Sequence, residues 1–152
     1  AAAKAMPPNA KIILVCGVPS WLKAEESAED DAGKKEFYRS LDYIAGIAKD
    51  EAQNATICAV LSGDTHHYSR YSAEPSKTQF ITAGGGGAFL HPTHQLNDKI
   101  AASWVRTGQT LSLTTEPGGE HKETDTAACY PTKEQSRALL RGNRRFVLTN
   151  PE

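Results

Sequence analysis

An apolar run that ends abruptly in polar residues constrains this chain more than any other feature. Residues 57–61 read Ile-Cys-Ala-Val-Leu and are followed at once by Ser62-Gly63-Asp64. A buried strand of a parallel sheet has this composition, and it delivers polar side chains to the carboxyl edge, where α/β proteins place their sites. We therefore expect an α/β fold whose functional residues follow a strand at residues 55–61.

Four of the five histidines lie in the segment just after this strand, within residues 62–94, at positions 66, 67, 91 and 94. Asp64 and His66 are two residues apart, so on an extended segment they point to the same side and can share a divalent cation. The pair also fits a hydrogen-bonded structural contact without metal, and the residues alone leave both interpretations open. Four glycines at residues 84–87 allow close backbone approach to a ligand or another chain, or form a simple turn.

The segments Gly-Asp-Thr-His-His-Tyr-Ser-Arg-Tyr (63–71) and Gly-Gly-Gly-Ala-Phe-Leu-His-Pro-Thr-His (85–94) resemble the calcineurin-like metallophosphoesterases. Within that superfamily they are similar to a bacterial and plant branch in which the phosphoesterase domain precedes membrane spans. The resemblance is specific over residues 60–94 and weaker over 11–22 and 130–150. It implies an α-β-β-α sandwich that holds two divalent metal ions (Mn, Fe or Zn) and hydrolyses phosphate mono- or diesters.

The resemblance also implies roles for single residues. Asp64 and His66 would be metal ligands within the late Gly-His-x-His block, with Asp64 at the position of its first histidine. His67 would act as general acid or donate a hydrogen bond to phosphate, and Arg70 would clamp an anion. The remaining expected substrate contacts are the glycine loop and the later histidines: Gly84, Gly85, Gly86, Gly87, His91 and His94.

Three metal-binding blocks that precede this segment in the superfamily (Asp-x-His, Gly-Asp-x-x-Asp and Gly-Asn-His-Asp/Glu) do not occur ahead of residue 63, and Gly17 stands where a ligand histidine is usual. We therefore expect the C-terminal half of a catalytic domain, inactive alone, whose partner is the missing N-terminal half or a second copy of the chain. The alternative is a non-catalytic binding or regulatory domain that retains the fold without the chemistry.

Residues 1–10 are expected to form a tail or linker and residues 11–150 a single, partial domain. Apolar patterning predicts a strand at 11–16, an amphipathic helix at 34–53 and a strand at 55–61 parallel to the first. Both faces of the two strands are apolar, and one helix can cover only one of them. A third strand at 78–82, after a turn at 74–77, is expected to pair antiparallel with 55–61 and so return His91 and His94 toward Asp64 and His66.

The C-terminal third is less regular. Residues 100–105 fit a short helix, residues 111–113 a strand, and residues 116–127 a loop. Thr132 and Gln135 have the spacing of a capping box, which predicts a helix to Arg141 that stops at Gly142. Residues 146–149 are expected to form a closing strand.

Composition narrows the function classes. A net charge of −1 without a basic stripe argues against nucleic-acid partners. The cysteines, at positions 16, 58 and 129, imply no disulfide framework and favour a reducing compartment. Five acidic residues within 25–33 predict a solvated loop. No run reaches the roughly 18 apolar residues of a membrane span, so we expect a cytoplasmic chain whose parent is attached to a membrane by a later segment.

Overall fold

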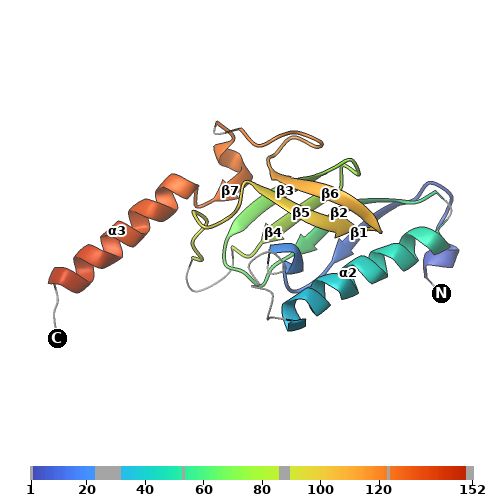
Figure 1. Cartoon of the computed structure of the whole chain (residues 1–152), viewed down its shortest axis with the longest axis horizontal. Helices are drawn as coiled ribbons and strands as arrows, with labels where there is room; N and C mark the ends of the chain where they lie inside the picture. The colour runs from blue at the N-terminus through green and yellow to red at the C-terminus, as the bar shows by residue number, and fades with distance from the viewer. Residues whose placement is uncertain (1, 23–31, 53, 86–89, 123, 150–152) are drawn as a thin grey trace.

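The computed structural model describes residues 2–22, 32–52, 54–85, 90–122 and 124–149. These residues form a mixed α/β fold with one open sheet of seven strands (Figure 1). The strands are β1 (Lys11–Val15), β2 (Thr56–Ser62), β3 (Tyr68–Glu74), β4 (Gln79–Ala83), β5 (Lys99–Trp104), β6 (Thr107–Leu113) and β7 (Cys129–Tyr130). The helices are α2 (Ala32–Glu51) and α3 (Lys133–Thr149), with 3-10 turns η1 (Ala3–Ala5) and η2 (Thr126–Ala128). Most of the expected acidic loop, residues 25–31, lies outside the described residues.

The strand order is β1-β2-β4-β3-β6-β5, with β7 beside β3. The predicted parallel pairing of β1 with β2 is confirmed. The predicted antiparallel pairing of 55–61 with 78–82 is wrong, because β4 runs parallel to β2 and the hairpin at 74–77 joins β3 to β4 instead. No strand was predicted at residues 68–74, where serines interrupt the apolar alternation. Ser69, Tyr71 and Ala73 nevertheless all point into the buried side of β3.

One face of the sheet carries the core. Helix α2, predicted from its 3.6-residue period, lies along this face (Figure 1) and buries Leu41 and Ala45 against it. Trp21 is 1% exposed, and its ring centroid lies 5.2 Å from that of Phe80 in an edge-to-face contact. The ring centroid of Phe80 lies in turn 4.9 Å from that of Trp104. Trp21 therefore packs onto the sheet, and each such ring contributes about 2 kcal/mol or more by burial.

Strands β5 and β6 form a hairpin whose two turn residues are both left-handed. Val105 and Arg106 have φ of 48° and 63°. Helix α2 holds this turn, because the Asp42 carboxylate accepts the N–H of Val105 and Asp50 forms an ion pair with Arg106 at 2.6 Å. The helix expected at residues 100–105 is thus wrong, since a short apolar run does not separate helix from strand. The strand expected at 111–113 is confirmed within β6.

Helix α3 begins at the predicted capping box. The N–H of Gln135 donates to Thr132 Oγ1 at 3.1 Å, and Thr132 N–H donates to Gln135 Oε1 at 2.9 Å. The predicted stop at Gly142 and the strand at 146–149 are wrong, because the helix continues to Thr149. A single glycine costs a helix only about 1 kcal/mol, which a capped start and further turns outweigh.

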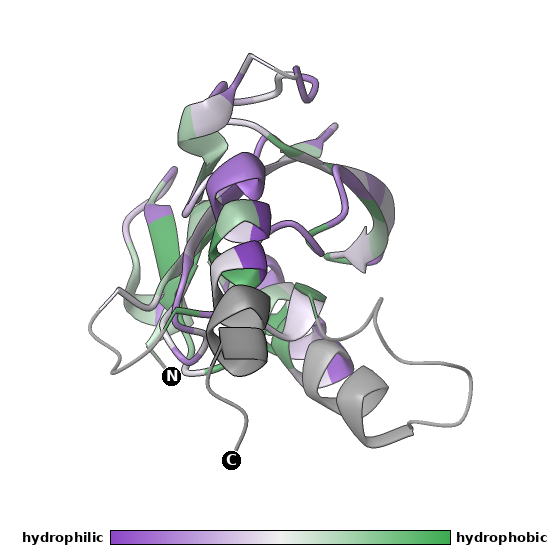
Figure 2. Ribbon diagram, turned by 90° about the vertical axis from the view of Figure 1, so that its left-hand side faces the viewer, coloured by the Kyte–Doolittle hydropathy of each residue, from purple (hydrophilic) through white to green (hydrophobic). Residues whose placement is uncertain are grey.

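Helix α3 extends away from the sheet (Figure 1), and hydrophilic and hydrophobic residues alternate along its first turns (Figure 2). Leu139 and Leu140 are 53% and 43% exposed. Neither α3 nor any other helix within the described ranges is long and apolar enough to cross a bilayer.

The second face of the sheet is apolar and open at its β1 end. Ile13 and Val15 are 60% and 78% exposed. Their register partners on β2, Ala59 and Leu61, are only partly buried, as is Ile81, which pairs with Leu61 on β4. We call these five residues the outer face. Contiguous apolar surface of this kind is typical of a surface that packs against another element.

We predict that the purified chain self-associates through the outer face or retains a partner there. Burial of several hundred Å² of apolar surface at about 25 cal/mol per Å² would stabilise the assembly by several kcal/mol before the entropy cost of association. Light scattering should give a mass above that of one chain, and Val15→Lys should shift it toward the monomer. A stable monomer at micromolar concentration would show that the outer face needs no cover.

Candidate functional site

The carboxyl ends of β1, β2 and β4 meet at one edge of the sheet because these three strands are parallel. The carbonyl of Gly17, just after β1, accepts the N–H groups of Gly63 (3.1 Å) and Asp64 (2.9 Å), just after β2. Two loops are thereby joined at the backbone. This contact fixes the direction of the backbone at Asp64. Asp64 is exposed at this edge.

His66 and His91 are brought together at this edge, as predicted. The His66 N–H donates to His91 Nδ1 at 2.9 Å, and the His91 N–H donates to the His66 carbonyl at 2.9 Å. The two rings are stacked, with centroids 5.2 Å apart and an angle of 19° between planes. Because His91 Nδ1 accepts a hydrogen bond, a neutral His91 ring carries its proton on Nε2.

His67 points into the protein and is 4% exposed. Its Nε2 lies 3.2 Å from Ser69 Oγ. Burial, together with the nearby His91, lowers the pKa of His67 to about 4. The ring is therefore neutral near pH 7, where it can donate one hydrogen bond but is rarely protonated, so the role of phosphate donor suits it better than that of general acid.

A cavity of about 200 Å³ lies beside these histidines and is lined by residues of three loops: Pro19, Leu22, Thr65, His67, His91, Pro92, Gln95 and Leu96. Several buried polar atoms at this edge have no hydrogen-bond partner among the described residues: Ser20 Oγ, Trp21 Nε1, Thr65 Oγ1 and His67 Nδ1. Buried polar atoms are rarely left unpaired. Two of these residues, Thr65 and His67, line the cavity, which indicates a place where a polar ligand or ordered water completes the hydrogen bonding.

The glycine loop serves the site by close backbone packing. A Cβ on Gly84 would lie 1.8 Å from the carbonyl oxygen of Thr65, whereas a Cβ on Gly85 would meet nothing within 4 Å. The Gly84 N–H donates to the His67 carbonyl at 3.0 Å, so it is already used within the protein. Gly86 and Gly87 lie outside the described residues.

Two of the predicted site residues, Arg70 and His94, form hydrogen bonds away from the cavity. Arg70 Nε donates to Gln79 Oε1 at 2.9 Å within the sheet, and Arg70 does not line the cavity. His94 Nδ1 lies 2.9 Å from Ser136 Oγ of α3, so His94 anchors that helix. Ser20, Trp21 and Thr65 also have buried polar atoms at this edge and were not among the predicted site residues; their positions in the segments that follow β1 and β2 were the available signal.

A metal ion can find a partial ligand set here. Asp64 and His66 supply oxygen and nitrogen donors at the strand edge, but no group of three or more His, Cys, Asp or Glu side chains converges within the described part of the chain. A pair of ions needs more donors than these two residues provide. The described residues alone therefore do not fit a complete two-metal centre.

Gly84→Ala is predicted to disrupt the edge, because its methyl group would overlap the Thr65 backbone. The expected loss is about 2 kcal/mol or more of unfolding free energy, measured by urea denaturation. Gly85→Ala is the matched control and should stay within about 0.5 kcal/mol of the parent chain. Equal effects of the two substitutions would contradict the close approach at Gly84.

A second prediction concerns pH. An unfolded histidine has a pKa near 6.5, and folded His67 has one of about 4. Between these values the unfolded chain binds more protons, so unfolding free energy should fall as pH drops from about 6.5 toward 4, by up to about 3 kcal/mol. Thermal melts with EDTA present should show this, and His67→Gln should flatten the profile while His94→Gln should not. An unchanged slope in His67→Gln would mean that another group causes the loss.

No protein-family model, curated protein or solved structure matches this chain.

Proposed function

We propose that this chain is part of the catalytic domain of a metal-dependent phosphoesterase, the C-terminal half of an α-β-β-α sandwich. The observation that carries the proposal is the joined edge, where the Gly17 carbonyl binds the backbone at Asp64 and where His66 and His91 are paired. This edge presents a carboxylate and imidazoles beside a cavity with unpaired polar atoms. The outer face supplies a surface on which a second sheet would pack.

When bound, a pair of divalent ions lowers the pKa of an attacking water and stabilises negative charge on the phosphoryl oxygens. The chain's own residues would position these groups. Asp64 and His66 would hold one ion, with the remaining ligands provided from outside the described residues. The two hydrogen bonds between His66 and His91, together with the stacking of their rings, would hold the His66 ring as supporting contacts do around metal ligands.

The cavity would receive the ester. Thr65 Oγ1 and His67 Nδ1 are buried there without partners in the described chain, and both can donate to phosphoryl oxygens. Because His67 stays neutral, its interaction with phosphate is a hydrogen bond from an uncharged ring. Leu22 and Leu96 line the same cavity and would exclude water from the bound group.

Two observations favour a second candidate, a binding or regulatory domain without catalysis. Gly17 has no side chain to bind metal, and Arg70, the expected anion clamp, is engaged with Gln79. Such a domain would bind a polar ligand in the same cavity and show no dependence on metal ions.

Metal titration separates the two candidates. Calorimetry with Mn²⁺ and Zn²⁺ should show weak binding to the parent chain, because only two ligands are available. Asp64→Ala combined with His66→Ala should weaken that binding about tenfold or more.

The matched control removes the same two residue types elsewhere, by Asp98→Ala combined with His121→Ala, and should bind as the parent does. Absence of binding, or binding that survives the Asp64 and His66 substitutions, would reject this metal site and favour the non-catalytic domain.

A further inference from the structure

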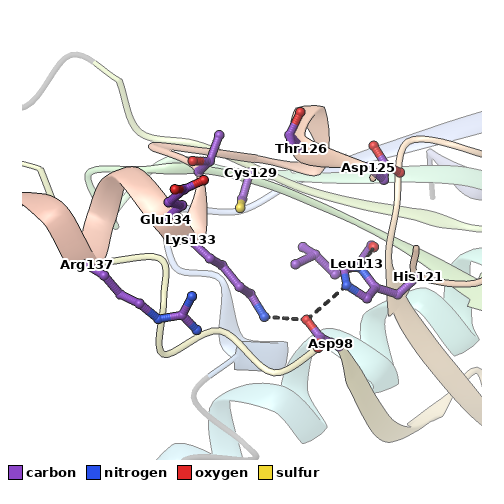
Figure 3. Close-up of a pocket in the computed structure, with 10 residues that line it drawn as sticks. Asp98, Leu113, His121, Asp125, Thr126, Cys129, Lys133, Glu134 and Arg137 are labelled. Atoms are coloured by element: carbon purple, nitrogen blue, oxygen red, sulfur yellow. Dashed lines mark hydrogen bonds and ion pairs between the residues drawn. The ribbon is translucent and has the colours of Figure 1, made fainter. Parts of the chain in front are cut away.

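A second and larger cavity lies where β5 begins, β6 ends and α3 starts (Figure 3). Its volume is about 320 Å³. Leu113 and Cys129, which are 1% and 5% exposed, form apolar lining. Burial raises the pKa of the Cys129 thiol, so it stays uncharged. The candidate site at the joined edge shares no lining residue with this cavity.

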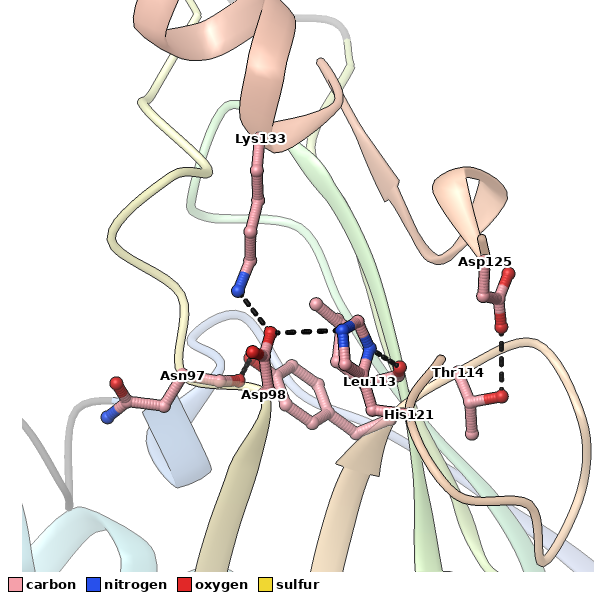
Figure 4. Close-up of polar contacts among 8 residues, drawn as sticks. Asn97, Asp98, Leu113, Thr114, His121, Asp125 and Lys133 are labelled. Carbon is pink, nitrogen blue, oxygen red and sulfur yellow. Dashed lines mark hydrogen bonds and ion pairs between the residues drawn. The ribbon is translucent and has the colours of Figure 1, made fainter. Parts of the chain in front are cut away.

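Two carboxylates in the lining are already satisfied by the protein (Figure 4). Asp98 Oδ1 accepts from Lys133 Nζ and lies 3.4 Å from His121 Nε2, while His121 Nδ1 lies 2.6 Å from the Leu113 carbonyl. Asp125 Oδ2 accepts from the Thr115 N–H at 2.7 Å and from the Thr114 hydroxyl at 2.9 Å. Asp98 is thus paired with a cation, whereas Asp125 keeps its charge, has its Oδ2 occupied by two neutral donors and lies at the opposite end of the cavity from Arg137 (Figure 3).

The cavity therefore has a surplus of donors. Lys133 and Arg137 are one helical turn apart on α3, and both line the cavity (Figure 3). Lys133 uses one of its three ammonium protons on Asp98. Arg137 forms no ion pair or side-chain hydrogen bond with the described residues, and the third carboxylate, Glu134, points away from it (Figure 3). A guanidinium and an ammonium with free protons are complementary to a carboxylate or phosphate group.

We propose that this cavity binds a small organic oxyanion, a carboxylate or a phosphate monoester. Arg137 and Lys133 bind the charged group, and Leu113 and Cys129 contact its apolar part. The ion pair from Asp98 to Lys133 holds the ammonium in place before the ligand arrives, which reduces the ordering that binding requires. This site is independent of the metal site proposed above.

The test uses the full chain in EDTA at low ionic strength. Its amide chemical shifts are recorded during titration with phenyl phosphate, benzoate and inorganic phosphate. Saturable shifts should centre on Cys129 and the first turn of α3. Phenyl phosphate or benzoate should bind more tightly than inorganic phosphate because of the apolar lining, and the better of the two identifies the charged group.

Arg137→Gln should weaken binding about tenfold, as expected for loss of a charge-assisted hydrogen bond. The control is Arg141→Gln, which removes the same charge from an exposed position one turn further along α3, outside the cavity lining. It should leave the affinity unchanged. No saturable shift with any probe, equal affinity in both variants, or shifts centred on residues 64–67 would each overturn the proposal.

Discussion

The carbonyl of Gly17 accepts two backbone N–H groups from the loop after β2, and the rest of the candidate site is arranged around this contact. It joins the first two parallel strands at their carboxyl ends, where the cavity opens. Backbone hydrogen bonds of this kind do not depend on side-chain rotamers. They fix the backbone from which the side chains of the flanking residues extend. The close approach of Gly84 to Thr65 adds the third parallel strand to the same edge.

The two faces of the sheet have different consequences for function. The covered face, where Phe80 contacts both Trp21 and Trp104, supports the edge. The outer face leaves apolar residues in water. A chain with its site on the edge between these faces can receive further ligands or further structure from the open side without disturbing its core.

Apolar runs predicted β1 and β2 correctly, and a 3.6-residue apolar period predicted α2, because burial of apolar side chains dominates local preference. Strand β3 was missed because Ser69 and Ser72 are buried through sheet pairing and side-chain bonds that no periodicity reveals. His91 was placed beside His66 for an incorrect reason. The expected antiparallel return does not exist, and parallel β4 reaches the same edge by its carboxyl end instead. His94 and Arg70 could not be placed, since their partners, Ser136 and Gln79, lie on elements whose packing is a tertiary property.

The left-handed turn of the β5–β6 hairpin bears on how the chain folds. Two-residue turns of this type favour Asn-Gly, and Val105-Arg106 is a poor substitute at about 1 kcal/mol or more per residue. The hairpin therefore lacks a local nucleus. Its turn is held by Asp42 and Asp50, which precede it by 63 and 56 residues. Closing loops of this length slows the search for native contacts, and this end of the sheet depends on α2 for its stability.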